Sequence, residues 1–208
     1  MDDAGRGPWD DVPRGLGVVL DEDRGNLPYV LIHGEALVAC AAWALGEAGV
    51  DLVDATVSWQ GIVESGEDLV LHDALCPMTP PDFLADCVRR AVAEDAVVAG
   101  VLPVTDTVKD VVERAGVTLV ASTHDRERLR RLASPLVLPA SVVARLDDWP
   151  DEDLLRAVAD LRSRTSVLFV DAPASATRVT SAADVARLEA LTSREGPPPP
   201  GSRRRPSA

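Results

Sequence analysis

The sequence is poor in cysteine and lacks any long apolar run. Its three cysteines, Cys40, Cys76 and Cys87, form no C-x-x-C pair, which argues against a disulfide scaffold and against a zinc knuckle. There is no basic-then-apolar leader and no run of about 18 apolar residues, so we expect neither secretion nor a membrane span. A reduced, cytoplasmic protein fits these absences best.

Positive charge is also scarce. The chain has 21 Lys and Arg residues against 34 Asp and Glu residues, which gives a net charge of −13. An acidic surface repels a phosphate backbone, so we expect no nucleic-acid partner. The 208 residues, 46% of them hydrophobic, are enough for one sizeable core, and no internal repeat is visible.

Both ends of the chain differ in composition from the part between them. Residues 1–14 are rich in Gly, Pro and Asp, which predicts a flexible leader. Residues 193–208 contain four consecutive prolines and then three arginines, which predicts a disordered tail. The tail arginines are either solvated or in contact with an acidic partner. We expect a single domain between these ends, over residues 15–192.

Short apolar runs alternate with amphipathic helices through this domain. Several runs are apolar almost throughout, as in strands that helices cover on both faces. Strands are expected at 16–20, 53–57, 68–72, 97–104, 117–121 and 166–170. The alternation predicts the α/β class, with a three-layer α/β/α sandwich around a mostly parallel, twisted sheet. The order of the strands does not follow from the pattern.

Two helices have clear start signals. In the helix expected at 80–94 the apolar residues lie on one stripe, with Thr79 as the expected N-cap and Pro80 as the first helical residue. Ser181, with Asp184 three residues further on, predicts a second N-cap before "VARLEAL". These signals indicate where both helices begin.

Polar side chains stand where two of the expected strands end. His72 and Asp73 close the run at 68–72, and Thr105, Asp106 and Thr107 follow the run at 97–104. Ligands of parallel α/β sheets bind beyond the carboxyl ends of the strands, so Asp73 and Asp106 are expected at one edge. There the two carboxylates either hold Mg²⁺ and accept hydrogen bonds from sugar hydroxyls, or only cap the turns that follow.

Two of these segments carry a resemblance. "VLHDALCPMTPPDFL" is similar to the "VHDAARP-x-T-x-x-x-L" segment of the 2-C-methyl-D-erythritol 4-phosphate cytidylyltransferases, and "VLPVTDTVKDV" resembles that family's "PV-x-DT-I/V-K-x-V". The two blocks are specific together, although each alone would be weak. "HGEALVACAAWAL", "STHDRERLRRLASPLVLP" and "ATRVTSAADVARLEAL" resemble further family segments, so the likeness covers about residues 15–192.

The resemblance implies a nucleotidyltransferase fold and a homodimer joined by an arm at about 110–140. It also implies that CTP and 2-C-methyl-D-erythritol 4-phosphate react, with Mg²⁺, to give a cytidylyl sugar alcohol and pyrophosphate. Carried over by position, it implies catalytic roles for Arg178 (lysine in the family) and Lys109, substrate binding by Thr105, Asp106, Thr107 and Ser134, nucleotide binding by Arg24, Gly25, Asp73 and Ala74, and metal binding by Asp73.

The chain departs from the family most strongly after the first strand. The family has "PAAG-x-G-x-R-x-G-x-x-x-PK" there, whose glycines let backbone N–H groups reach the triphosphate and whose Arg and Lys clamp its charge. This chain has "VVLDEDRGNLPYVLIHGE", with carboxylates at 21–23 where phosphate is expected. Arg24 and Gly25 preserve only part of the pattern, and Tyr29 stands about where the lysine belongs.

Two classes of function remain open on the sequence. The first is a divergent family member, inactive or very weak, that binds a small sugar phosphate or a nucleotide, or that regulates a partner. The second is a working cytidylyltransferase of the non-mevalonate isoprenoid pathway that uses Mg²⁺ and handles CTP through other residues. The altered loop at 20–29 favours the first class.

Overall fold

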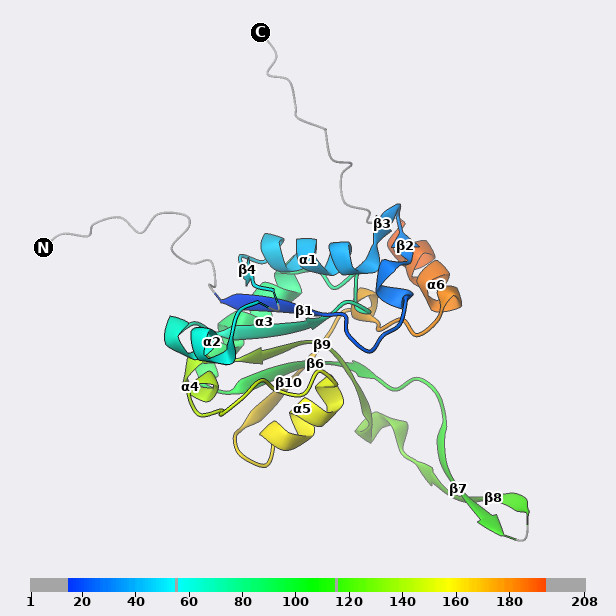
Figure 1. Cartoon of the computed structure of the whole chain (residues 1–208). Coiled ribbons are helices and arrows are strands. Elements are labelled where there is room, and N and C mark those ends of the chain that lie inside the picture. Colours follow the sequence, from blue (N-terminus) through cyan, green and yellow to red (C-terminus); the bar gives the residue numbers. More distant parts are fainter. Residues whose placement is uncertain (1–14, 55, 115, 194–208) are drawn as a thin grey trace, which may run out of the picture.

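The computed structural model describes residues 15–54, 56–114 and 116–193. The leader expected at 1–14, and the tail from residue 194 onward, lie outside the described residues. Figure 1 shows a central sheet between two layers of helices, with a two-stranded arm that projects from the body. The α/β/α sandwich predicted from the sequence is therefore confirmed.

The elements alternate along the chain as the sequence indicates. The strands of the central sheet are β1 (Leu16–Leu20), β4 (Asp51–Leu52), β5 (Leu69–Asp73), β6 (Val97–Pro103), β9 (Arg130–Leu138) and β10 (Val167–Asp171). Two further pairs are the hairpin β2 (Leu31–Ile32) and β3 (Glu35–Ala36) and the arm β7 (Val108–Arg114) and β8 (Val117–His124). The α-helices are α1 (Leu37–Glu47), α2 (Trp59–Ser65), α3 (Pro81–Glu94), α4 (Ala140–Val143), α5 (Leu154–Leu161) and α6 (Ala182–Thr192). Short 3-10 turns are η1 (Leu27–Tyr29), η2 (Arg126–Arg128) and η3 (Ala174–Ala176).

The sheet has the order β10-β6-β9-β5-β1-β4. Strand β9 is antiparallel to both of its neighbours, β5 and β6, and the other neighbouring strands pair in parallel. The carboxyl ends of β1, β5, β6 and β10 therefore meet at one edge of the sheet. This is the edge at which open α/β sheets place their ligands.

The core consists of two layers, one on each face of the sheet. Neighbouring residues along a strand point to opposite faces. Val70 and Val98 thus pack against α1 and α3, while Leu71 and Ala99 pack against α2, α4 and α5. None of the helices in the described part of the chain combines the length and apolar content needed to cross a bilayer.

Two local expectations are wrong. The expected strand at 53–57 is a turn in which the Asp54 carboxylate accepts hydrogen bonds from the amide and hydroxyl groups of Thr56, and only Asp51–Leu52 pair with β1. The N-cap position of α3 is Pro80, not Thr79, whose hydroxyl instead donates to the Cys76 carbonyl. The N-cap at Ser181 is confirmed, because its hydroxyl accepts from the Asp184 amide.

The segment 110–140 contains two different structures. Strands β7 and β8 form the arm, whereas Arg130–Leu138 is a central strand that the sequence analysis did not expect. The run at 117–121 is a strand, but it lies in the arm and not in the sheet. The arm is therefore shorter than the resemblance implies, and its return strand belongs to the core.

Gly100 lets β6 approach β9 closely at an irregularity in their pairing. A Cβ atom at position 100 would lie 2.9 Å from the backbone oxygen of Ser134. We expect Gly100→Ala to lower the free energy of unfolding by about 1–3 kcal/mol, because β9 would have to shift. Urea unfolding measures this.

The matched control for this prediction is Gly46→Ala in α1, where a Cβ atom would have no neighbour within 4 Å. This substitution is expected to stabilise the protein by roughly 0.5–1 kcal/mol through helix propensity. Equal stability of Gly100→Ala and the unsubstituted protein would contradict the expectation of a tight β6–β9 contact.

Candidate functional site

The site is centred on Asp73, the last residue of β5. All five residues of β5 are buried, and Asp73 lies opposite Leu20 at the end of β1. The amide of Ala74 then donates to the Leu20 carbonyl, so the chain turns while it is still anchored to the sheet. Asp73 is itself only 3% exposed. A strand covered on both faces thus delivers a carboxylate to the ligand-binding edge.

Two arginines and one amide bind the Asp73 carboxylate. Its Oδ1 atom accepts from Arg24 Nε at 2.9 Å and from the Leu75 amide at 2.9 Å, and its Oδ2 atom accepts from Arg178 Nε at 2.8 Å. Burial by itself would raise the pKa of Asp73, but the hydrogen bonds from Arg178, Leu75 and Arg24 and the charge of Arg178 hold that pKa below its usual value. Asp73 is therefore an ionised carboxylate that lies between two cations.

Each of the three guanidinium nitrogens of Arg24 donates to an oxygen atom of this chain. Besides Asp73, its Nη1 atom donates to the Glu22 carbonyl, and its Nη2 atom donates to the Glu152 carbonyl at 3.0 Å. Its side chain is only 8% exposed. Arg24 thereby joins the loop after β1 to the segment before α5, across the site.

Arg178 is held differently. The next residue, Val179, is buried, and its amide donates to the Leu75 carbonyl at 2.8 Å, which fixes the backbone beside Asp73. The Arg178 side chain is 38% exposed, and only its Nε atom has a hydrogen-bond partner within the described residues. Its two terminal nitrogens are therefore available to a ligand.

Ser134 supports Asp73 from the neighbouring strand β9. Its hydroxyl oxygen accepts from the Asp73 amide at 3.1 Å and shares a second hydrogen bond with Nδ1 of His72. His72 is completely buried, and its Nε2 atom has no partner within the described residues. Burial lowers the pKa of His72 to about 4, although the charge of Asp73 acts in the opposite direction. His72 is therefore a neutral structural residue at neutral pH.

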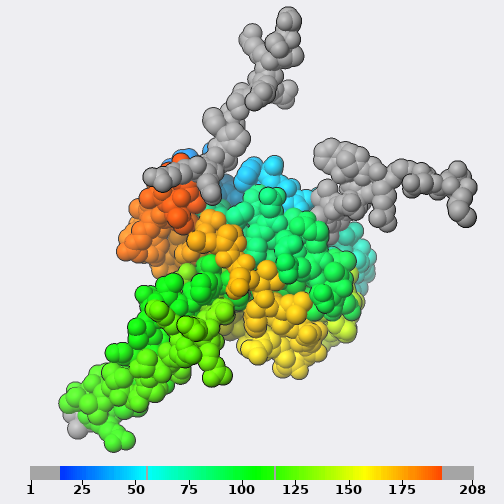
Figure 2. All heavy atoms as spheres, turned by 180° about the vertical axis from the view of Figure 1, so that it is seen from behind, coloured from blue at the N-terminus to red at the C-terminus, as the bar shows by residue number. Residues whose placement is uncertain are grey.

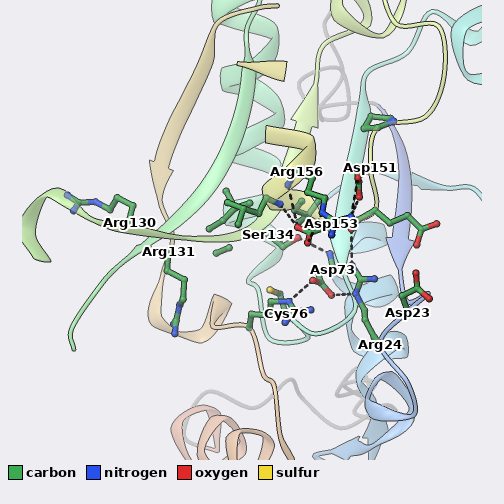
Figure 3. Close-up of a pocket in the computed structure, with 17 residues that line it drawn as sticks. Asp23, Arg24, Asp73, Cys76, Arg130, Arg131, Ser134, Asp151, Asp153 and Arg156 are labelled. Atoms are coloured by element: carbon green, nitrogen blue, oxygen red, sulfur yellow. Dashed lines mark hydrogen bonds and ion pairs between the residues drawn. The ribbon is translucent and has the colours of Figure 1, made fainter. Parts of the chain in front are cut away.

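Arg24, Asp73, Ser134 and Arg178 line one cavity of about 900 Å³ (Figure 3). Five arginines and five carboxylates line it, in an unequal distribution. Asp151, Glu152 and Asp153 lie on the segment before α5, and Asp23 lies on the loop after β1. Partial burial and the charge of Glu22 raise the pKa of Glu152, although residues 151–153 are exposed. The remaining lining residues are Arg24, Asp73, Cys76, Arg130, Arg131, Leu132, Ala133, Ser134, Pro150, Leu154, Leu155, Arg156 and Arg178.

The structure brings together four of the residues implied by the resemblance: Arg24, Asp73, Ser134 and Arg178 all line the cavity. Ala74 does not, because it is completely buried beneath the site. Gly25 also lies outside the lining, at an exposed turn with φ of 57°, a conformation that suits glycine.

The residues after β6 lie outside the cavity lining. Thr105, Asp106 and Thr107 are exposed in the loop between β6 and the arm, and Lys109 is exposed in β7. The loop is held by Arg126, which donates to the Thr105 carbonyl at 3.0 Å. Asp73 and Asp106 follow strands that end at the same edge, but within this chain Asp106 is not part of the cavity.

Sequence reasoning missed six of the ten charged lining residues. Arg130, Arg131 and Arg156, and the carboxylates at 151–153, were not expected at the site. The paired arginines in "LRRLASP" were a usable signal, because they directly precede an apolar run that begins at the cavity. That signal is interpretable only once the run is recognised as a central strand.

The residues around Asp73 do not fit a metal ion in this arrangement. Both carboxylate oxygens already accept from arginine or amide groups. Within the described ranges, no three His, Cys, Asp or Glu side chains gather at a spacing that would hold a metal. Mg²⁺ binding by Asp73 would require an arginine to move away, so it stays a prediction.

The fold and the cavity at the carboxyl edge of the sheet define a nucleotidyltransferase-like protein. A sequence profile described as 2-C-methyl-D-erythritol 4-phosphate cytidylyltransferase matches residues 49–194. The chain belongs to this family.

Relatives and solved structures agree with this assignment. Proteins named 2-C-methyl-D-erythritol 4-phosphate cytidylyltransferase from Corynebacterium diphtheriae and Corynebacterium glutamicum are 29% and 36% identical over 83% and 60% of this chain. The matches span 66% and 44% of those relatives, less than two thirds of either. The solved enzyme of that name from Thermus thermophilus has a TM-score of 0.60 at 16% identity, covering 85% of this chain and 98% of its own. The solved 4-diphosphocytidyl-2C-methyl-D-erythritol synthase from Anaerococcus prevotii also has a TM-score of 0.60, at 14% identity, covering 89% and 98%.

The neutral, buried state of His72 predicts a loss of stability in mild acid. Its pKa is about 4 in the folded protein against an ordinary 6.5, so below pH 6.5 the unfolded chain takes up a proton that the folded chain does not. As the pH falls from 6.5 to 4, this proton uptake is expected to reduce the free energy of unfolding by up to about 3 kcal/mol. Urea unfolding across this range measures the effect. The variant His72→Gln should lose this part of the pH dependence. An equally steep fall of its free energy of unfolding between pH 6.5 and 4 would contradict the assignment of the effect to His72.

Proposed function

We propose that this chain is a divergent family member that binds a small phosphorylated ligand in its cavity and transfers CMP from CTP at or near the background rate. The observation that carries the proposal is the state of Arg24. It is the only cation between residues 20 and 30, and all three nitrogens of its guanidinium donate to oxygens of this chain. The loop therefore offers a triphosphate no free cation.

Neighbouring charges oppose a triphosphate as well. Asp21, Glu22 and Asp23 precede Arg24, and Asp23 lines the cavity together with Asp151 and Asp153. At an effective dielectric of about 20, a carboxylate roughly 8 Å from a phosphate charge costs on the order of 2 kcal/mol. Solvent and salt screen much of this in an open loop. Repulsion is therefore the smaller of the two effects.

The loss of preorganised donors is the larger effect. Each missing donor that would stabilise the charge developing at the α-phosphate removes about 3–4 kcal/mol of transition-state stabilisation. The family loop supplies such donors through its glycines, Arg and Lys, whereas this loop has Tyr29, whose hydroxyl donates to Asp21. Two missing donors correspond to a rate lower by roughly four to six orders of magnitude.

A working cytidylyltransferase is the second candidate, and the curated relatives favour it because they carry that enzyme's name. In this alternative, the complex of CTP with Mg²⁺ would draw Arg24 and Arg178 away from Asp73. The freed carboxylate and the acidic loop would then face the metal instead of the phosphates. The two candidates therefore differ in whether Asp73 keeps its arginines when nucleotide is present.

Calorimetric titration of CTP with Mg²⁺, together with an assay of pyrophosphate release, separates the candidates. We expect CTP binding weaker than micromolar and turnover with 2-C-methyl-D-erythritol 4-phosphate at background. The Corynebacterium diphtheriae relative, assayed in parallel, controls for the quality of the substrates. Micromolar affinity for CTP combined with turnover of about one per second would contradict the proposal and support the second candidate.

We also propose that the chain forms a homodimer through the arm. Figure 2 shows the arm standing clear of the body, and a two-stranded ribbon is at best marginally stable alone. Val111 lies opposite Val120, and Val112 lies opposite Leu119. These four side chains are 42–59% exposed. Neighbouring residues of a strand point to opposite faces, so each face of the ribbon exposes one apolar pair, and such a ribbon is suited to a second copy of the chain.

Light scattering at micromolar concentration is expected to give the mass of a dimer. The double variant Val112→Lys and Leu119→Lys should be monomeric, because the charges would have to be buried at the interface. Val92→Lys on α3 is the matched control, since Val92 is an equally exposed valine, at 58%, that lies away from the arm. A monomer in the unsubstituted protein would rule out the dimer.

A further inference from the structure

Arg131, in β9, is a cation at the cavity without a partner. It lines the cavity, and within the described residues no hydrogen bond or ion pair engages its guanidinium group. Arg130 differs, since its Nε atom lies 3.7 Å from an Asp171 oxygen and its Nη1 atom donates to the carbonyls of Glu127 and Leu129. In Figure 3, Arg130 points away from Asp73 and Cys76, whereas Arg131 extends toward the side where these two residues lie.

The position of Arg131 is related to a difference between the segment "VLHDALCPMTPPDFL" and the family motif. Cys76 stands where the family motif "VHDAARP" has arginine, so the cavity lacks a cation at that position. Cys76 is buried, and burial with the charge of Asp73 raises its pKa to about 12, while the charges of Arg178 and Arg131 act in the opposite direction. Arg131, Arg178 and Cys76 all line the same cavity. Arg131 supplies from β9 a charge that position 76 no longer provides.

Arg178 completes a cationic side of the cavity. Its Nε atom is bound to Asp73, and its terminal nitrogens have no partner within the described residues. Because Asp73 is neutralised by Arg24 as well, the Arg131–Arg178 side keeps an excess of positive charge. Another part of the cavity is lined by Asp23, Asp151, Glu152 and Asp153, with Arg156 lying 4.0 Å from Asp151 and from Asp153, so carboxylates outnumber cations there. Such a cavity suits a ligand with one anionic end.

We propose that Arg131 and the terminal nitrogens of Arg178 form a binding site for a single phosphate group, and that Arg131 determines the specificity for it. Two guanidinium forks match the several oxygens and the double charge of a phosphate monoester. A chain of further phosphates would have to extend toward the carboxylates of Asp23, Asp151 and Asp153. The site therefore selects a monophosphate over a triphosphate. This inference rests on the proposed function, since it names the group by which the ligand is held.

The experiment compares Arg131→Gln with Arg90→Gln, an exposed arginine of α3 that pairs with Asp86 and lies outside the cavity lining. The probes are inorganic phosphate, glycerol 3-phosphate and inorganic triphosphate, titrated calorimetrically at constant ionic strength. Loss of a charge-assisted donor should weaken binding of both monophosphate probes about tenfold to a hundredfold in Arg131→Gln. Arg90→Gln should change it less than about twofold. The unsubstituted protein should bind triphosphate more weakly than either monophosphate.

Equal losses in the two variants would overturn the proposal, because they would indicate only a general effect of surface charge. Undetectable binding of monophosphates at millimolar concentration, or tighter binding of triphosphate, would overturn it too. Arg131→Lys keeps a point charge without the fork, so it should bind with intermediate affinity if the variants are folded normally.

The turnover assay distinguishes this inference from the proposed function. Rapid turnover with an Arg131-dependent phosphate site would contradict only the proposed function, and background turnover without Arg131 dependence would contradict only this inference.

Discussion

The arrangement of the site depends on the pairing of the Asp73 carboxylate with Arg24 and Arg178. Three segments far apart in the sequence meet there: the loop after β1, the tip of β5 and the chain before α6. A carboxylate as buried as Asp73 is stable only when it is paired, and the guanidinium of Arg24 is nearly as buried. Removal of either partner would leave an uncompensated charge. The same contacts that hold the site together therefore engage all three guanidinium nitrogens of Arg24 and leave only the terminal nitrogens of Arg178 without a partner in the described residues.

This pairing lies apart from the packing that maintains the family fold. The sheet edge, the cavity and the strand that carries Asp73 depend on packing in the two core layers, which the loop after β1 does not enter. The loop can thus exchange glycines for carboxylates with little effect on the core. Arg24, through the Glu152 carbonyl, joins that loop to the segment before α5 and partly closes the cavity from within.

Much of the fold could be predicted from the sequence, because apolar runs such as 68–72 and 97–104 are signals of burial on both faces. The missed strand β9 illustrates the limit. Its run begins with two arginines and contains Ser134-Pro135, so local composition does not indicate a central strand, and only pairing with β5 and β6 makes it one. In the site, Asp73, Arg24, Ser134 and Arg178 followed from the resemblance. The carboxylates at 151–153 did not, because their place depends on how the chain returns from α4, anchored by the hydrogen bond from Trp59 to the Leu146 carbonyl.

The antiparallel insertion of β9 also has a consequence for how the chain reaches this structure. Strands β5 and β6 are parallel but not adjacent, so each presents an unpaired edge toward the other until Arg130–Leu138 enters between them. On a ribosome that segment emerges only after the whole arm. Until that segment has emerged, β5 and β6 each keep an apolar edge with unpaired hydrogen-bonding groups exposed. Under this condition sheets can pair wrongly with other chains. The late return of β9 joins the two parts of the sheet before α4, α5 and β10 are added, and it gives this domain a long-range folding topology that is intrinsically slow.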